Sequence, residues 1–302
     1  MTAADRDNVL LLSGNEAIAR GAWEAGARFG GGYPGTPSSE ILPALGELGE
    51  CYVEWSVNEK VALEVGIGAS LAGARVIVTM KHVGLNVAAD PLFTLAYTGV
   101  EGGLVIVTAD DPAMRSSQNE QDNRNYARAA KVPMLEPADS QEARDMTMLG
   151  FELSERFDSP VLLRPVTRVC HSDSLVQVGE RQAVELRGDL EPNAHKYVMI
   201  PAWATARRAE MARRIEALIA FAEETDLNFV IEGDSSLGVI ASGAAYQYAR
   251  EVAPEASFLK LGMLWPLPPE KIRRFAQSVD RLVVIEELDP FLAEQVRAMG
   301  IE

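Results

Sequence analysis

A glutamate at the start of a predicted helix is the strongest candidate for acid–base chemistry. Glu59 follows an apolar run at residues 51–57 and begins a helical pattern over residues 59–73. A carboxylate there could be catalytic, because active sites of α/β proteins gather where strands end and helices begin. Without other information, the more frequent role of such a carboxylate is to cap the helix and complement its dipole; the adjacent Asn58 could be the cap instead. The residue alone leaves both interpretations open.

Two polar loops follow other predicted strands. Lys81, His82 and Asn86 crowd the loop after one apolar run, and Gln118 lies in an amide-rich loop after the next. Ammonium, imidazole and amide groups can bind an anion or a carbonyl, and ligands of α/β proteins usually bind in this region. Taken alone, each loop could also be a surface loop that hydrogen-bonds to itself.

A glycine- and proline-rich segment at residues 30–39 leads into a further predicted helix. Its backbone amides, around Pro34, Gly35 and Thr36, could face an anion or a ring at the helix N-terminus. The segment matches neither GxGxxG after a first strand nor GxxxxGK(S/T), so nucleotide binding by those routes is weakly supported. The alternative is an ordinary turn capped by Ser38.

The elements around these groups alternate between strand and helix in the first half of the chain. Most of the predicted strands are apolar on both faces, which is typical of a parallel sheet covered by helices. Repeated strand–helix units predict an α/β fold with a doubly wound parallel sheet. The predicted strands are residues 8–12, 51–57, 75–80, 104–109 and 160–165, and the helices are residues 16–29, 59–73 and 141–156.

The strand–helix alternation stops between residues 170 and 226, where a polar segment precedes a long charged helix over residues 205–224. It returns with strands at residues 229–232, 238–242 and 282–286 and helices at residues 244–251 and 290–299. We therefore predict a first domain at residues 1–170, a linker with a long helix at 171–227 and a smaller α/β domain at 228–302.

The composition narrows the classes of function. The 302 residues have a formal net charge of −16, which would repel nucleic-acid phosphates and anionic membrane surfaces. The sequence shows neither an apolar signal-peptide core nor a stretch long enough to span a bilayer, so a cytoplasmic protein is expected. Two distant cysteines and three scattered histidines predict neither a disulfide framework nor a metal held by this chain.

Several long strings together resemble one family of enzymes, the 2-oxoacid:ferredoxin oxidoreductases, in the alpha subunit of the indolepyruvate ferredoxin oxidoreductase type. The resemblance covers nearly the whole chain. The strings are YPGTPSSEI at residues 33–41, EWSVNEKVALEVGIGASLAGAR at 54–75, TMKHVGLNVAADPL at 79–92, SSQNEQDNR at 116–124, VPMLEPADSQEA at 132–143 and KLGMLWPLP at 260–268.

The resemblance implies an enzyme that uses thiamine diphosphate, coenzyme A and iron–sulfur clusters to convert an arylpyruvate into acyl-CoA, carbon dioxide and reduced ferredoxin. Glu59 matches the carboxylate that contacts N1′ of the thiamine pyrimidine. A proton shared with N1′ favours the imino tautomer, whose 4′-nitrogen can remove the C2 proton. Thr36 matches a position near substrate and cofactor. The loop positions assign Pro34, Gly35 and Asn86 to the cofactor and Lys81, His82 and Gln118 to the 2-oxoacid.

The resemblance also implies that part of such an enzyme lies elsewhere. The family's alpha subunit continues into a domain that holds the diphosphate through Mg²⁺, and then into a cysteine-rich segment. Gly233-Asp234-Ser235 begins like the Gly-Asp-Gly diphosphate motif, but no asparagine follows Asn228 to complete it. The expected fold is thus a pyrimidine-type thiamine domain followed by a transketolase-C-terminal-like domain, from a fragment of a longer chain or a split subunit.

The expected partners follow from the same resemblance. They are a subunit or chain segment that carries the diphosphate domain and the iron–sulfur clusters, ferredoxin, coenzyme A, the 2-oxoacid and a second copy of this chain. Two alternatives stay open. One is a component of another thiamine enzyme, such as a transketolase-like system. The other is a non-catalytic α/β binding module, such as an electron-transfer flavoprotein-like subunit, in which Glu59 only complements a helix.

Overall fold

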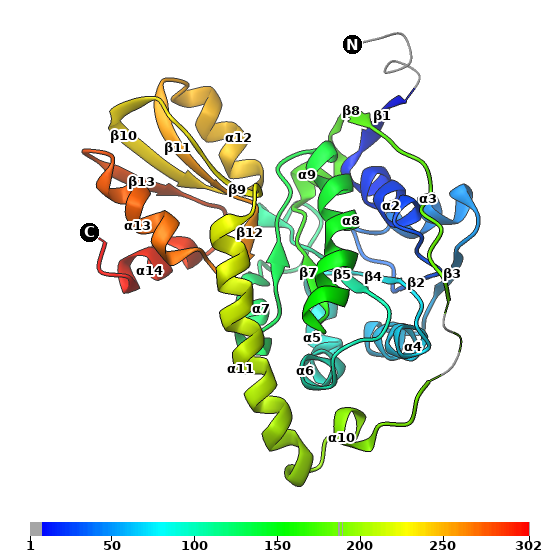
Figure 1. Ribbon diagram of the computed structural model, residues 1–302. Coiled ribbons are helices and arrows are strands. Elements are labelled where there is room, and N and C mark those ends of the chain that lie inside the picture. The colour runs from blue at the N-terminus through cyan, green and yellow to red at the C-terminus, as the bar shows by residue number, and fades with distance from the viewer. Residues whose placement is uncertain (1–7, 187, 189, 302) are drawn as a thin grey trace.

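The computed structural model describes residues 8–186, 188 and 190–301. Two sheets of unequal size lie side by side, and the long helix α11 (Pro201–Glu224) runs between them and projects below (Figure 1). In the part of the chain described, no helix combines the length and the apolar character that crossing a membrane requires.

The larger sheet has seven strands in the order β12-β6-β7-β5-β4-β2-β3. All neighbouring strands are parallel except β12, which pairs antiparallel with β6 at one edge. The predicted doubly wound α/β fold is therefore confirmed. The strands are β2 (Phe29–Gly32), β3 (Tyr52–Trp55), β4 (Val76–Lys81), β5 (Leu104–Ala109), β6 (Met134–Leu135), β7 (Val161–Leu163) and β12 (Met263–Trp265).

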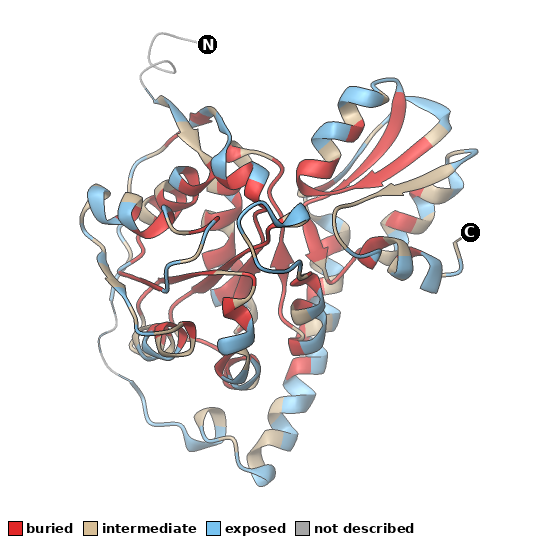
Figure 2. Ribbon diagram, turned by 180° about the vertical axis from the view of Figure 1, so that it is seen from behind, coloured by how far each residue is buried: buried red, intermediate tan, exposed pale blue. Residues whose placement is uncertain are grey.

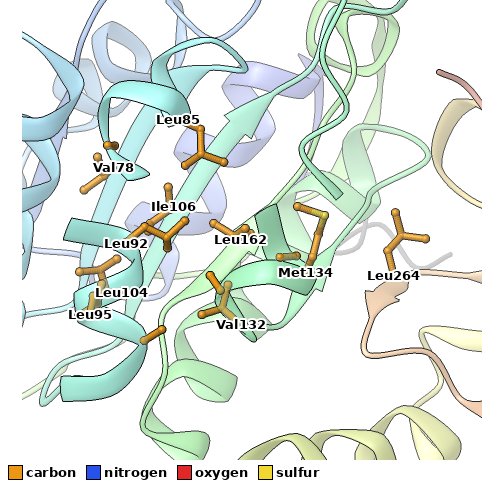
Figure 3. Close-up of a cluster of buried hydrophobic side chains, with 14 of the residues drawn as sticks. Val78, Leu85, Leu92, Leu95, Leu104, Ile106, Val132, Met134, Leu162 and Leu264 are labelled. Atoms are coloured by element: carbon orange, nitrogen blue, oxygen red, sulfur yellow. The ribbon is translucent and has the colours of Figure 1, made fainter. Parts of the chain in front are cut away.

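Helices cover both faces of this sheet because successive strand residues alternate between two buried apolar clusters. Val76 and Val78 of β4 face the helices α4 (Glu59–Leu71), α5 (Gly84–Val87), α6 (Ala89–Thr98) and α7 (Arg124–Ala130), and this cluster continues to Leu264 in β12 (Figure 3). Ile77 faces the opposite side, with the helices α2 (Gly14–Glu24), α3 (Ile41–Leu48) and α8 (Ser140–Phe157). Figure 2 shows the strands as the most deeply buried layer.

The smaller sheet has four strands in the order β13-β10-β11-β9. The strands β10 (Asp234–Ala241), β11 (Ala256–Leu261) and β13 (Leu282–Ile285) are parallel, and β9 (Asn228–Ile231) is antiparallel to β11. The helices α12 (Gly243–Val252), α13 (Pro269–Gln277) and α14 (Phe291–Ala298) accompany it. The segment after β11 crosses over, as β12, to the larger sheet. The proposed division at residues 170 and 227 remains a prediction, and we call residues 228–302 the C-terminal region.

Two expectations about strands differ from the structure. The first predicted strand, β1 (Val9–Ser13), does not join the parallel sheet; it pairs antiparallel with β8 (Asp173–Gln177) in a separate ribbon, and its Leu11 is 65% exposed. The glycines 30–32, read as part of a turn, form the strand β2. Close packing explains this, because a Cβ on Gly32 would lie 2.6 Å from Oγ1 of Thr79. Short helices complete the fold: η1 (Pro112–Met114), α9 (Thr167–His171) and α10 (Ala194–Tyr197).

Candidate active site

The candidate residues follow four strands that are neighbours in the larger sheet. The order β3-β2-β4-β5 brings together the segments after each strand, which carry Glu59, Thr36, the residues from Lys81 to Asn86, and Gln118 respectively. The four strands are parallel, so their carboxyl ends lie at one edge. The sheet order therefore gathers at one edge the groups that the sequence spreads over 83 positions.

Glu59 is the first residue of α4 and is 9% exposed. The helix is capped by its neighbour, because Oδ1 of Asn58 accepts a hydrogen bond from the Val61 amide at 3.0 Å; the prediction that Asn58 is the cap is confirmed. Among the residues described, none donates a hydrogen bond to the Glu59 carboxylate at this edge. The carboxylate lies against Gly84, where an added Cβ would come within 2.5 Å of Oε1. A glycine at position 84 thus leaves room for a carboxylate that remains available to a ligand.

The two polar loops bind one another. The Lys81 ammonium donates to the carbonyl oxygen of Ser116 at 3.1 Å. Asn86 donates from Nδ2 to Oε1 of Gln121 at 2.8 Å and accepts from the Tyr126 hydroxyl at 2.6 Å. The structure therefore brings together two loops whose positions in the sequence gave no sign of contact. Several of their polar groups hydrogen-bond to one another.

His82 and Gln118 have opposite environments. The His82 side chain is fully buried, its Nε2 lies 3.2 Å from Oδ1 of Asn119, and its Nδ1 has no partner among the described residues. Gln118 is exposed and makes no hydrogen bond with the described part of the chain. A substrate at this edge could contact Gln118 directly. The buried His82 ring could affect a substrate only through the loop residues that it contacts, such as Asn119.

The turn at residues 34–36 packs onto the same group of loops. Pro34 and Thr36 are exposed, and a Cβ on Gly35 would lie 2.8 Å from Cβ of Lys81. Ser38 closes this turn, as the alternative interpretation expected, because its hydroxyl donates to the Gly35 carbonyl at 3.0 Å. It does not cap the next helix, since α3 begins at Ile41 with Glu40 as its N-cap. The turn reaches its helix only after four further residues, so its amides do not form the helix N-terminus.

Two residues that the sequence analysis missed organise the amide-rich loop. Asp111 accepts hydrogen bonds from the Ser117 hydroxyl at 2.5 Å, the Thr167 hydroxyl at 2.6 Å and the Ser116 amide at 2.8 Å. Burial of this carboxyl opposes ionisation, but these hydrogen bonds outweigh it and lower the pKa of Asp111 to about 2. Asn123 is fully buried and donates to the His82 carbonyl at 3.1 Å. Their positions after β5, within a polar run, were the available signal.

A cationic cavity lies beside this loop. It has a volume of about 180 Å³ and is lined by Arg115, Thr167, Arg168, His171 and Ser172. Arg115 precedes Ser116, whose carbonyl holds Lys81, so the cavity and Lys81 flank the same stretch of backbone. In a protein of net charge −16, this side of the edge is a local site where an anionic group can bind.

Comparisons with known proteins point to one family. The family model described as pyruvate flavodoxin/ferredoxin oxidoreductase, thiamine diP-binding, matches residues 20–234. Indolepyruvate oxidoreductase subunit IorA of Archaeoglobus fulgidus is 46% identical over 99% of this chain and 50% of its own length, and the Methanothermobacter thermautotrophicus subunit of the same name is 44% identical with the same coverage. The chain thus spans about half the length of these curated relatives.

The solved structures agree on the fold. A 2-oxoglutarate:ferredoxin oxidoreductase from Magnetococcus marinus, solved with 2-oxoglutarate, coenzyme A and succinyl-CoA bound, superposes with a TM-score of 0.80 at 16% identity. The match covers 97% of this chain and 60% of that chain. At this identity the likeness establishes a shared architecture.

Proposed function

This chain belongs to the pyruvate flavodoxin/ferredoxin oxidoreductase family, and on that premise we propose that it supplies the pyrimidine half of a thiamine-dependent active site. The proposed enzyme oxidises a 2-oxoacid of the indolepyruvate type to acyl-CoA and carbon dioxide and reduces ferredoxin. One observation carries the proposal. Glu59 lies at the carboxyl edge of the sheet with a carboxylate that no described residue binds, while Asn58 already caps the helix.

The residues around Glu59 fit a thiamine pyrimidine. A carboxylate without a protein partner can hold a proton at N1′ of the ring, and Gly84 keeps the space beside that carboxylate free of a side chain. Thiamine, when bound, supplies a carbon nucleophile and an electron sink for the loss of carbon dioxide. Pro34, Gly35 and Asn86 are proposed to border the cofactor, since they belong to the segments after the adjoining strands β2 and β4.

The 2-oxoacid is proposed to lie against Thr36, Lys81 and Gln118. Thr36 and Gln118 are exposed, and Lys81, the last residue of β4, places a positive charge at the end of that strand. His82 is proposed to support the substrate loop from behind, because its ring is fully buried and lies against Asn119. A cation and an amide around a 2-oxoacid would bind its carboxylate and its carbonyl.

The remaining parts of the enzyme are proposed to come from a partner subunit or a further chain segment. This chain has two cysteines, and burial raises the pKa of the Cys170 thiol well above its usual range, which disfavours the thiolate that an iron–sulfur cluster requires. The Mg²⁺-bound diphosphate and the clusters are therefore assigned to the other half. Ferredoxin, coenzyme A and a second copy of this chain complete the proposed complex.

The test replaces Glu59 with glutamine in the enzyme reconstituted with its other half. Glu59→Gln keeps the size of the side chain but removes the carboxylate, so hydrogen exchange at thiamine C2 should slow by roughly 10²- to 10⁴-fold, as for the loss of a general acid–base group. The melting temperature should stay unchanged, because Asn58 provides the cap. The matched control is Glu64→Gln on the same helix, whose carboxylate side chain is 51% exposed. Normal C2 exchange in Glu59→Gln would reject the proposed function.

A further inference from the structure

A buried arginine connects the C-terminal region to the candidate active site. Arg124 is 1% exposed and begins α7, directly after the amide-rich loop. Its Nη1 donates to Oε2 of Glu286 at 2.7 Å, and its Nη2 donates to the carbonyl oxygens of Glu287 and Asp289 at 2.8 and 2.9 Å. One guanidinium thus binds acceptors of three residues in the turn between β13 and α14.

The same guanidinium holds the end of the loop. Nε of Arg124 donates to both carboxylate oxygens of Asp122, at 2.9 and 3.0 Å. Burial of Asp122 favours its neutral form, but the hydrogen bonds from Arg124 outweigh burial and lower the pKa of Asp122. The pair is therefore ionic, and it fixes the direction in which the chain leaves the loop.

From Asp122 the contacts continue to the proposed substrate residues. Gln121 donates from Nε2 to the His82 carbonyl at 2.9 Å and accepts from Asn86. Further along the loop, Asn119 contacts the His82 ring and Ser116 binds Lys81. Residues 116–122 thus pack against the segment from Lys81 to Asn86 and hydrogen-bond to it.

The loop has two anchors of different origin. At its beginning, Asp111 holds Ser116 and Ser117 from within the larger sheet. At its end, Arg124 holds Asp122 to Glu286, which belongs to the C-terminal region and also accepts from the Leu292 and Ala293 amides of α14. The second anchor makes the geometry of the loop depend on a part of the chain that contributes no side chain to the candidate site.

We infer that Arg124 and Glu286 are positioning residues, through which the C-terminal region holds the loop at residues 116–122 in the geometry that binds the 2-oxoacid. The link between the two parts of the chain stands on the contacts alone. Only its consequence for substrate binding rests on the proposed function.

The first experiment measures hydrogen–deuterium exchange in the full chain. Glu286→Gln removes the charge that Arg124 binds, and amides in residues 116–122 should exchange roughly tenfold faster, which corresponds to about 1.4 kcal/mol of local stability. The matched control is Lys260→Met. Lys260 is 1% exposed and joins β11 to α8 through Glu142 at 2.6 Å, so this variant breaks another, partly buried ion pair between the same two parts without touching the loop.

Two outcomes of this experiment would overturn the inference. One is unchanged exchange in residues 116–122 while the α14 amides of Glu286→Gln exchange faster, because the contact would then be lost without effect on the loop. The other is equal acceleration in Lys260→Met, which would show general loosening. Arg124→Lys is the second variant. The lysine ammonium cannot bind Asp122 and Glu286 at the same time as the planar guanidinium does, so Arg124→Lys should also speed amide exchange in the loop.

The second experiment uses the reconstituted enzyme. Glu286→Gln should raise KM for the 2-oxoacid by roughly tenfold while thiamine C2 exchange stays within about twofold of the wild-type rate. A parallel fall in C2 exchange would overturn the positioning role, because the change would then reach Glu59. If the wild-type complex itself shows no C2 exchange that depends on Glu59, the proposed function fails, and the exchange of the loop still decides whether the two parts are linked.

Discussion

The two sheets use their carboxyl edges in opposite ways. In the larger sheet, this edge carries an unbound Glu59 carboxylate and an exposed Gln118. In the smaller sheet, the segments after the strands are covered by charged groups of the first half of the chain: Glu136 accepts from the Ser242 hydroxyl after β10, and Arg124 binds Glu286 after β13. Parallel sheets usually bind ligands at this edge. In the smaller sheet the edge instead joins two parts of the chain, and we call this contact region, which includes Glu136 with Ser242 and Arg124 with Glu286, the joint.

The charged side chains also differ between the two edges, because those near the joint are buried and paired. Arg164, Asp110 and Glu136 are all nearly fully buried near the joint, where Nε of Arg164 donates to Asp110 at 2.7 Å and its Nη1 binds Glu136. At the open edge, the Glu59 carboxylate and the Gln118 side chain make no hydrogen bond with the described part of the chain, whereas at the joint the charged side chains of Arg164, Asp110 and Glu136 bind one another. The predictions below test each side of this difference.

The largest expected effect is at the joint. Arg164→Met would leave Asp110 and Glu136 buried without a cation, so the free energy of unfolding should fall by about 3–5 kcal/mol. The measurement is urea denaturation followed by circular dichroism. Arg213→Met is the control, because its pair with Glu210 is exposed and should contribute no more than about 1 kcal/mol. A loss of the same small size in Arg164→Met would show that the joint is not held by this network.

The next effect is at the open edge. Gly84→Ala would place a Cβ within 2.5 Å of the Glu59 carboxylate and displace it. A shift of about 1 Å in a catalytic group lowers rates by roughly 10²-fold, and we expect that loss in thiamine C2 exchange of the reconstituted enzyme. Gly68→Ala is the control, since open space surrounds Gly68 in α4 and alanine should stabilise the helix by about 0.5–1 kcal/mol. Equal C2 exchange in both variants would contradict the proposed clearance.

Asp111 gives a pH-dependent test of the loop that lies between the two edges. Its folded pKa is about 2 against an ordinary value of 3.8, so ionised Asp111 stabilises the fold by about 2 kcal/mol above pH 4. This contribution is lost as the pH falls from 4 toward 2. The stability difference between wild type and Asp111→Asn should therefore shrink by about 2 kcal/mol between pH 5 and pH 2, measured by urea denaturation. A difference independent of pH would mean that the hydrogen bonds do not hold an anion.

Local patterns predicted much of this architecture. The predicted strand at residues 104–109 matches β5, and the helix that begins at Glu59 was expected from its apolar spacing. Strand β2 was missed because glycine has low strand propensity, and only the packing of Gly32 against Thr79 requires it there. The contact of Arg124 with Glu286 spans 162 positions, so no spacing in the sequence could have indicated it.

The candidate site likewise has features that the sequence predicted and features that it did not. The positions of Glu59 and the loop from Lys81 follow from strand ends, which apolar runs reveal. The burial of His82 and the roles of Asp111 and Asn123 depend on which loops meet, and that is decided by the order of strands in the sheet. Types of residue at strand ends are therefore predictable, but whether each faces a ligand or another loop is not.

The smallest expected effect separates capping from chemistry at neighbouring residues. Asn58→Ala removes the side chain that accepts from the Val61 amide, and loss of such a cap typically costs about 1 kcal/mol. Thiamine C2 exchange at saturating cofactor should stay within about twofold of the wild-type rate, because Glu59 is retained. Asn58→Ser, which keeps a capping oxygen, should recover most of the stability. The pair of measurements is thermal melting and C2 exchange, in which Asn58→Ala and Glu59→Gln should show opposite patterns. If Asn58→Ala slows exchange as much as Glu59→Gln does, both residues act through the helix terminus, and the carboxylate at the open edge has no separate role.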